Sequence, residues 1–380
     1  MKKLKLLIFL LGLLLAVGCD KTVKDTEVID TPPIQTARET YVAGFTQKDT
    51  RLNTWNHAFK RAQQDSLRVT LPYAESGTFS SKTTVAHSYT IQLRAGENLV
   101  VALQTQPDTT LVFIDLFRKT EDSLPTYSLI KSVSTHTDTL NYKSDAYGLY
   151  KVIIQPEMAK TVPFQLKMYT QPIYSFPVVG AGNADVRSFW AANRGAGTRS
   201  HEGIDIYAAK GTPVIAIANG KITSTTDGEL GGKQIYLEDK ELKTSIYYAH
   251  LDTVLTKKDR KVSIGDTIGL VGNSGNAKDL EPHVHFGIFL EKTGPIDPYP
   301  YVKQTEIPNL PTYTGATRGV VLSNKASIFQ GPSAALQQIE SLSKNDTISI
   351  LGQHRNWFRV LSKESVLGFI TTTQLEVLAN

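Results

Sequence analysis

Four of the eight histidines in this chain of 380 residues lie within the 85 residues that run from His201 to His285. Three short segments hold them: His201-Glu202-Gly203-Ile204-Asp205, Tyr247-Tyr248-Ala249-His250-Leu251 and His283-Val284-His285. Three of these four histidines have apolar neighbours, which is typical of a metal site and not of a polar tail. The fold must therefore bring three separated segments together at one place.

The first segment is not predicted to be helical. Gly203, Ile204 and Ile206 all disfavour a helix, so we expect His201 and Asp205 on an extended or turning stretch. The pair His201-Glu202 does not begin the helical His-Glu-x-x-His zinc motif, because position 205 is Asp and Gly203 interrupts the turn. We reject that motif.

The last segment is predicted to be a strand. His283 and His285 are two residues apart in an apolar run that extends to Leu290, and strand alternation puts both imidazoles on one side. One of them can bind a metal while the other faces the substrate. Together, His201, Asp205 and His285 would supply two nitrogens and one carboxylate and leave a fourth position for water, which is the composition of a hydrolytic zinc site.

Two histidines remain outside this predicted ligand set. His250 and His283 are candidates for proton transfer, and the sequence leaves open which of them is the base. Alternation also puts Tyr248 on the strand face of His250, so we expect Tyr248 as a candidate pocket residue.

Residues 173–302 resemble the lysostaphin-like (LytM-type) peptidoglycan metallopeptidases, because four motifs occur in that family's order. They are Arg199-Ser200-His201-Glu202-Gly203-Ile204-Asp205-Ile206, Tyr248-Ala249-His250-Leu251, Gly269-Leu270-Val271-Gly272-Asn273-Ser274-Gly275 and Pro282-His283-Val284-His285-Phe286. The resemblance implies that His201, Asp205 and His285 bind Zn²⁺ and that His250 and His283 assist catalysis. It also implies a zinc-dependent endopeptidase that hydrolyses peptide bonds of peptidoglycan stems or cross-links, with zinc lowering the pKa of bound water toward ~7.

Two other classes of function compete with this interpretation. A non-catalytic cell-wall-binding or hydrolase-activating envelope protein could keep the same fold, but such relatives usually lose ligands and this chain keeps them all. Gly211-Thr212-Pro213-Val214 and residues 264–269 are also similar to the turns of lipoyl and biotin carrier domains. Those carriers present a lysine at a hairpin tip, and no lysine here has that setting.

Residues 1–19 are predicted to be a lipoprotein signal peptide, with lysines at the start and an apolar core over residues 6–17. The core is short for a membrane span, and Ala16-Val17-Gly18-Cys19 resembles a bacterial lipoprotein cleavage site. We therefore expect a cell-envelope protein that is anchored to a membrane by lipid on Cys19 and faces the periplasm or exterior. Cys19 is the only cysteine, so once it is lipidated a thiol nucleophile and a cysteine-ligated metal are excluded.

The net charge does not favour a nucleic-acid partner. The formal charge is +5, but three lysines lie in the signal peptide, and removing these three from 41 basic residues leaves 38 against 36 acidic ones. We expect peptidoglycan as the partner and no nucleic acid. The oligomeric state is left open.

The rest of the chain is predicted to be mostly β and multidomain. Residues 20–67 are predicted to form a polar tether followed by a helical segment, because Trp55, Phe59 and Ala62 have helical spacing. His57 is expected to be exposed on this helix. Residues 68–171 contain short alternating runs and are predicted to form a β-sandwich accessory domain. Its expected strands are residues 89–93, 99–103, 110–117, 149–154 and 163–169. His87 and His136 are expected at its surface.

Residues 172–303 are predicted to form the zinc peptidase domain, a β-sheet fold. Its expected strands are residues 212–222, 234–238, 244–251, 262–271 and 283–290, and residues 180–199 are expected to form a loop that lines a groove. After a linker over residues 303–315, residues 316–380 resemble a bacterial SH3-like domain, an SH3-like barrel. The motifs concerned are Ser327-Ile328-Phe329-Gln330-Gly331-Pro332-Ser333, Trp357-Phe358-Arg359-Val360 and Leu367-Gly368-Phe369-Ile370. His354 is expected in a loop of this domain.

Overall fold

The computed structural model describes residues 36–46, 48–120, 126–134, 139–194 and 197–378. The predicted signal peptide, Cys19, most of the tether and His136 lie outside the described residues. The described part is mostly β, as predicted from the sequence. Within it, no helix has both the length and the apolar character needed to cross a membrane.

Two helices precede the first strand, α1 (Ala37–Ala43) and α2 (Thr50–Gln64). The first begins with a capping box, in which the Thr36 hydroxyl accepts the Glu39 N–H and the Glu39 carboxylate accepts the Thr36 N–H. One face of α2 is buried through Leu52, Trp55, Ala58 and Ala62. Helix therefore forms where the spacing of apolar residues predicts it, and His57 lies on the exposed face.

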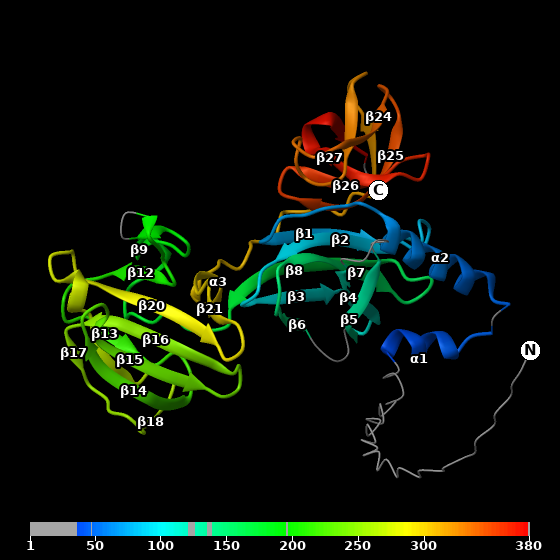
Figure 1. Cartoon of the computed structure of the whole chain (residues 1–380). Coiled ribbons are helices and arrows are strands. Elements are labelled where there is room, and N and C mark those ends of the chain that lie inside the picture. Colours follow the sequence, from blue (N-terminus) through cyan, green and yellow to red (C-terminus); the bar gives the residue numbers. More distant parts are fainter. Residues whose placement is uncertain (1–35, 47, 121–125, 135–138, 195–196, 379–380) are drawn as a thin grey trace, which may run out of the picture. The chain divides into compact units, whose positions relative to one another are not determined.

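Two sheets share one buried core in the region after the helices (Figure 1). The first has the order β2-β7-β4-β5, and the second contains the neighbours β1-β8-β3-β6. Their bounds are β1 (Tyr73–Phe79), β2 (His87–Leu93), β3 (Glu97–Thr105), β4 (Val112–Lys119), β5 (Tyr127–Ser134), β6 (Leu140–Lys143), β7 (Gly148–Pro156) and β8 (Val162–Pro172). Alternate side chains of both sheets, such as Ile91 and Val152 from one and Val101 and Leu166 from the other, fill the core. All five strands expected here are present.

An eight-stranded sheet forms the region that contains the histidine motifs. Its order is β18-β14-β15-β16-β20-β12-β9, with β21 paired to β20. The strands are β9 (Val186–Ser188), β12 (Ile204–Tyr207), β14 (Gly220–Gly228), β15 (Gly232–Asp239), β16 (Thr244–Leu251), β18 (Lys261–Val262), β20 (His283–Leu290) and β21 (Gly294–Ile296). The adjacent strands β16, β20 and β12 (Figure 1) carry four of the five candidate site residues, which are His250, His283, His285 and Asp205.

Smaller elements complete this region. They are the three-stranded sheet β13 (Pro213–Ile215), β19 (Thr267–Leu270) and β17 (Thr253–Val254), the hairpin β10 (Asn193–Arg194) and β11 (Arg199–Ser200), the helix α3 (Tyr299–Val302) and the 3-10 turns η1 (Asn183–Asp185) and η3 (Gly275–Ala277). The single strands expected at residues 212–222 and 262–271 are each split in two. The chain passes from one sheet to another in the first case. In the second, Gly265 at a φ of +92° and the Asp266 carboxylate, which accepts the Ser263 N–H, make a turn.

The C-terminal region begins after residues 303–317, which contain no helix or strand. Its strands are β22 (Arg318–Val321), β23 (Ala326–Phe329), β24 (Gln338–Leu342), β25 (Thr347–His354), β26 (Trp357–Leu361), β27 (Leu367–Thr371) and β28 (Leu375–Val377), with the 3-10 turn η4 (Thr372–Gln374). Strand β25 pairs with β1, so one sheet continues between the two regions. A buried ion pair also connects the two regions. Arg359 Nε on β26 lies 2.9 Å from Glu75 Oε1 on β1.

The predictions for His87 and His354 are wrong, because His87 is buried and not at the surface, and His354 lies on strand β25 and not in a loop. His87 makes edge contacts with the rings of Phe79 and Phe164, and neither of its ring nitrogens has a hydrogen-bond partner. Burial lowers its pKa to about 3. His354 ends β25, stacks on Tyr73 with ring centroids 4.2 Å apart, and donates from Nδ1 to the Ala74 carbonyl. A lone histidine among mixed residues carries no sequence signal that separates a core position from a surface one.

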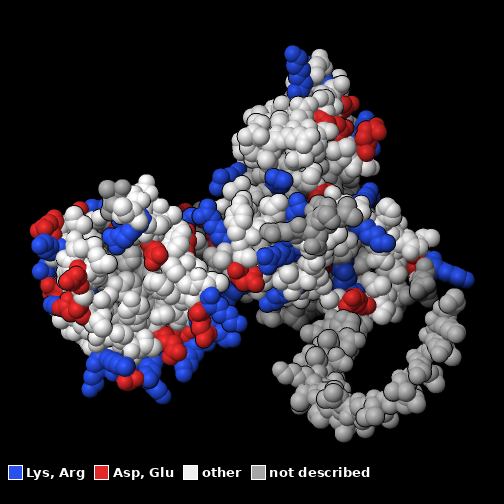
Figure 2. Space-filling model, viewed as in Figure 1, with Lys and Arg blue, Asp and Glu red and all other residues white. Residues whose placement is uncertain are grey.

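The charged side chains on the face drawn in Figure 2 are of both signs and interspersed. The lower edge of that face, where Figure 1 has β14 and β18, carries basic and acidic residues together.

Candidate metal centre and active site

Two of the candidate ligands are brought together by strand register. In the antiparallel pair β12 and β20, Asp205 is directly opposite His285, and Tyr207 is opposite His283. Asp205 Oδ1 lies 3.1 Å from His285 Nδ1. On its other side, β20 pairs with β16, with Ala249 opposite His285. The prediction of strand geometry for His283 and His285 is confirmed.

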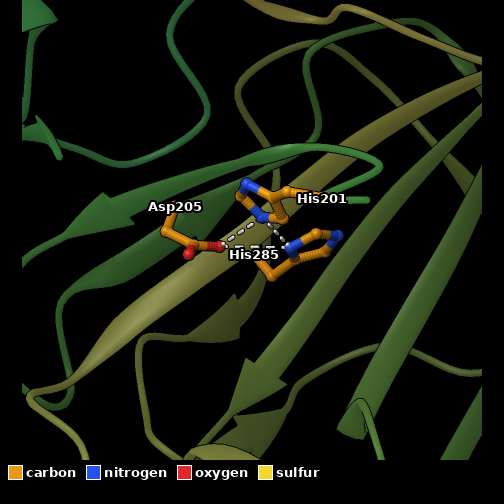
Figure 3. A group of neighbouring side chains, drawn as sticks. All are labelled: His201, Asp205 and His285. Carbon is orange, nitrogen blue, oxygen red and sulfur yellow. Dashed lines mark hydrogen bonds and ion pairs between the residues drawn. The ribbon is translucent and has the colours of Figure 1, made fainter. Parts of the chain in front are cut away.

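The third candidate ligand, His201, lies in the short connection between β11 and β12. Its backbone exchanges hydrogen bonds with Ala191 and Ala192, which fixes the connection. The ring Nδ1 lies 2.9 Å from the Phe189 carbonyl oxygen, which can only accept, so Nδ1 carries the proton. Nε2 is then left with a lone pair. It lies 3.1 Å from Asp205 Oδ1 and 2.9 Å from His285 Nδ1 (Figure 3).

These three atoms suit a zinc ion. Zinc bonds of about 2.0–2.1 Å at tetrahedral angles put neighbouring ligand atoms about 3.3 Å apart, close to the observed triangle. Three electron-rich atoms at such distances repel one another unless a cation or protons lie between them. Burial raises the pKa of Asp205, but the close contacts with the imidazoles of His201 and His285 outweigh burial and hold that pKa well below its usual range. The donor set therefore fits a divalent cation.

Gly203 makes room for the third ligand. A Cβ at this position would lie 2.5 Å from the Phe286 carbonyl oxygen and 2.7 Å from His285 Cε1. Contacts this short do not occur for real side chains, so any larger residue would displace the imidazole of His285. The glycine in the first motif is explained by this close approach and not by an unusual φ.

The other two histidines lie beside the ligand triangle. His250 Nδ1 is 3.0 Å from the Ser274 carbonyl oxygen and His283 Nδ1 is 2.7 Å from that of Glu281, so each ring donates from Nδ1. In the neutral form of either ring, the lone pair is then on Nε2. Their ring centroids are 5.1 Å apart. Burial, followed by the nearby His283, lowers the pKa of His250 to about 4. His250 is therefore neutral near pH 7 and able to accept a proton.

All five predicted residues line one cleft of about 500 Å³. The rest of its lining includes two arginines from the hairpin β10–β11, the side chain of Tyr247 and two exposed leucines: Arg194, Arg199, Tyr247, Leu230 and Leu280. Of the described residues in the range 180–199, Arg194 and Arg199 line the cleft, and the range also contains short strands that were not predicted. The cleft is deep enough at the histidines to bury His201 and His283 almost completely.

The prediction that Tyr248 is a pocket residue is wrong. Tyr248 is fully buried in the sheet core, and its hydroxyl accepts the Ile217 N–H, whereas Tyr247 lines the cleft. The cause is the backbone of His250, which has a φ of +60° beside an irregularity in the pairing of β15 with β16. This conformation turns His250 toward the cleft side and breaks the alternation on which the prediction rested.

Sequence patterns also missed Arg194, which contacts a ligand. Its Nη2 donates to Asp205 Oδ2 and, at 2.7 Å, to Ser188 Oγ. Ser188 Oγ in turn lies 3.3 Å from His201 Nδ1. Arg194 lies in a stretch without periodicity or motif, and only the folding of β10 and β11 over the sheet brings it to the ligands.

The region that contains the cleft is similar to known proteins. Residues 199–298 match the model of Peptidase family M23. The matched residues include all five predicted residues that line the cleft.

The chain is similar in part to several curated proteins. It is 33% identical over 144 residues to an L-Ala–D-Glu endopeptidase of Bacillus subtilis, and this alignment covers 35% of this chain and 44% of the relative. It is 29% identical over 143 residues to the glycyl-glycine endopeptidase ALE-1 of Staphylococcus capitis, covering 36% and 38%. The peptidoglycan DD-endopeptidase ShyC of Vibrio cholerae is 26% identical over 126 residues, covering 33% and 27%. The chain spans less than half the length of these relatives.

A solved structure is also similar to this region. The catalytic domain of lysostaphin from Staphylococcus simulans is 26% identical, and the alignment covers 34% of this chain and 90% of that one with a TM-score of 0.27.

Proposed function

We propose that this protein is a zinc-dependent endopeptidase that hydrolyses peptide bonds of peptidoglycan stems or cross-links in the cell envelope. The observation that carries the proposal is the convergence of three ligand atoms, within 3.1 Å of one another, beside two imidazoles that donate from Nδ1 to backbone carbonyls. The names of the similar proteins support the substrate class, since they describe endopeptidases, including a peptidoglycan DD-endopeptidase.

His201 Nε2, Asp205 Oδ1 and His285 Nδ1 would hold the metal. When bound, zinc polarises a scissile carbonyl and makes water more acidic. The chain's own part is to hold and move protons. One of His250 and His283 takes a proton at Nε2 from the attacking water, and the other stabilises the developing oxyanion or passes a proton to the leaving amine. General acid and base assistance of this kind is typically worth about a hundred-fold to ten-thousand-fold in rate.

The environment of the two imidazoles supports these roles. Both donate from Nδ1 to backbone carbonyls, so their orientation and tautomer are fixed before substrate binds. His283 also stacks on Tyr207, with ring centroids 5.0 Å apart. A neutral His250 is available as a base because burial disfavours its protonated form.

The rest of the chain completes the proposal. Residues 1–19 act as a lipoprotein signal peptide, and lipid on Cys19 anchors the protein to a membrane facing the periplasm or exterior. Residues 20–67 form a tether and helical segment, residues 68–171 a β-sandwich accessory domain, and residues 172–303 the peptidase domain. Residues 316–380 form an SH3-like domain that assists in binding the wall.

The test is a digest of purified peptidoglycan with the chain from Asp20 onward. We expect new peptide ends in the released fragments by mass spectrometry, and none with His285→Ala. His57→Ala, which changes an exposed helix residue, is the matched control and should cut like the parent. If the protein binds zinc and retains peptidoglycan but does not cleave it, the result would support the alternative, a cell-wall-binding or hydrolase-activating envelope protein.

A further inference from the structure

Arg194 connects the rim of the cleft to its candidate ligands. It lies on β10, opposite Arg199 of β11, and its side chain is 34% exposed. The buried end of the side chain forms an ion pair with Asp205, whose own side chain is only 8% exposed. A cation that is not itself a candidate ligand thus contacts the carboxylate of one.

The two oxygens of Asp205 have separate partners. Oδ1 lies 3.1 Å from both His201 Nε2 and His285 Nδ1, whereas Oδ2 accepts a hydrogen bond from Arg194 Nη2. A charge-assisted hydrogen bond to one oxygen fixes the rotation of a carboxylate. The contact with Arg194 therefore leaves Oδ1 as the oxygen directed at the two imidazoles.

The same guanidinium reaches a second ligand indirectly. Arg194 Nη2 donates at 2.7 Å to Ser188 Oγ, which lies 3.3 Å from His201 Nδ1. Ser188 is held at this place because it is opposite Asp205 in the pairing of β9 with β12. One side chain thus supports both Asp205 and the hydrogen-bonded side of His201.

We propose that Arg194 is a positioning residue of the metal centre, which holds Asp205 so that Oδ1 alone faces the metal and supports the orientation of His201 through Ser188. The inference rests on the proposed zinc site. Groups that orient metal ligands in this way typically contribute about ten-fold to a hundred-fold to metal affinity.

The first test measures zinc affinity and not activity. In competition with a chromophoric chelator, Arg194→Gln should bind Zn²⁺ about ten-fold to a hundred-fold more weakly than the parent. Arg194→Lys keeps a cation within reach of Oδ2 and should recover part of the loss. Arg187→Gln is the matched control, because Arg187 lies on β9 and pairs with exposed Glu281 without contacting a ligand. Its zinc affinity should equal that of the parent.

The second test reads the coordination of Asp205 directly. When Oδ2 is released, the carboxylate can bind a metal through both oxygens, and the higher coordination number weakens the visible absorption of bound Co²⁺. We expect this weaker absorption in Arg194→Gln and a spectrum nearer the parent's in Arg194→Lys. Parent-like zinc affinity and an unchanged Co²⁺ spectrum in Arg194→Gln would overturn the inference.

Two controls separate this inference from the proposed function. If His285→Ala binds zinc as well as the parent does, the ligand assignment itself is wrong, whatever Arg194 does. Should Arg194→Gln fail to fold by circular dichroism, Arg194→Met, which also removes the cation from Oδ2, carries the same comparison. Parent-like metal binding by a folded Arg194→Met variant would then overturn the role of Arg194.

Discussion

Asp205 and His285 stand directly opposite each other on β12 and β20, with Oδ1 and Nδ1 3.1 Å apart. Two of the three candidate ligands are therefore set by the pairing of two strands, whose other faces are buried in the sheet core. If one of these strands slipped by one residue, its ligand would move to the core face and its core side chains would move to the cleft face. The stability of the sheet therefore protects the geometry of the site.

We predict that removing His250 separates chemistry from metal binding. His250→Ala should keep Zn²⁺, because its ring is not one of the converging atoms, and should lose activity by about a hundred-fold to ten-thousand-fold. His285→Ala should lose both. Metal content by atomic emission and the rate of peptidoglycan cleavage check this. Full turnover by a zinc-loaded His250→Ala variant would remove this residue from the mechanism.

Gly203→Ala should abolish tight zinc binding while the sheet remains folded. The new Cβ would meet the Phe286 carbonyl oxygen at 2.5 Å and the ring of His285 at 2.7 Å, so the imidazole must move away from Asp205. Gly148→Ala is a suitable comparison, since its nearest contact would be an ordinary 3.8 Å. Zinc titration of both variants checks the prediction, which fails if Gly203→Ala binds zinc like the parent.

Buried His87 should make the protein less stable in mild acid. Its pKa is about 3 in the folded protein, against an ordinary value of 6.5 for a histidine in an unfolded chain. Below pH 6.5 the unfolded chain therefore takes up a proton that the folded protein does not. Stability contributed by neutral His87 is therefore present above that pH and is lost as pH falls. Between pH 7 and pH 5, His87 alone should lower the free energy of unfolding by about 2 kcal/mol.

Urea unfolding of His87→Leu at the two pH values isolates this contribution. Leucine has a similar volume and no titrating group, so the variant should lose less stability on acidification than the parent does. His57→Leu removes an exposed imidazole and should behave like the parent. The prediction is contradicted if His87→Leu and the parent respond equally to pH.

The sequence predicted the elements that build the site better than the backbone detail within it. Both β16 and β20 have the bounds that were predicted, and β20 was predicted from its apolar run, which is typical of a strand buried on most of its length. The motifs also named the five residues that converge in the cleft, although their roles remain predictions. The sequence pattern does not indicate the positive φ of His250. For that reason Tyr248 was expected in the pocket, whereas Tyr247 lines it.

Other features could not be read from the sequence because they depend on contacts between distant segments. Arg194 lies in a stretch with no periodicity. Its proposed positioning role depends on a contact with Asp205 that exists only after β10 and β11 have paired. The burial of His354 depends on Tyr73 and Ala74, about 280 residues away along the chain. Sequence spacing carries information about neighbours on one element and none about such pairs.

The most direct test of the account is to remove and restore the metal. The chain from Asp20 onward, stripped by a chelator and dialysed, should no longer release peptides from purified peptidoglycan, and one equivalent of Zn²⁺ per chain should restore the release. His285→Ala treated in the same way should stay inactive. Undiminished cleavage by the metal-free protein would contradict a zinc-dependent endopeptidase.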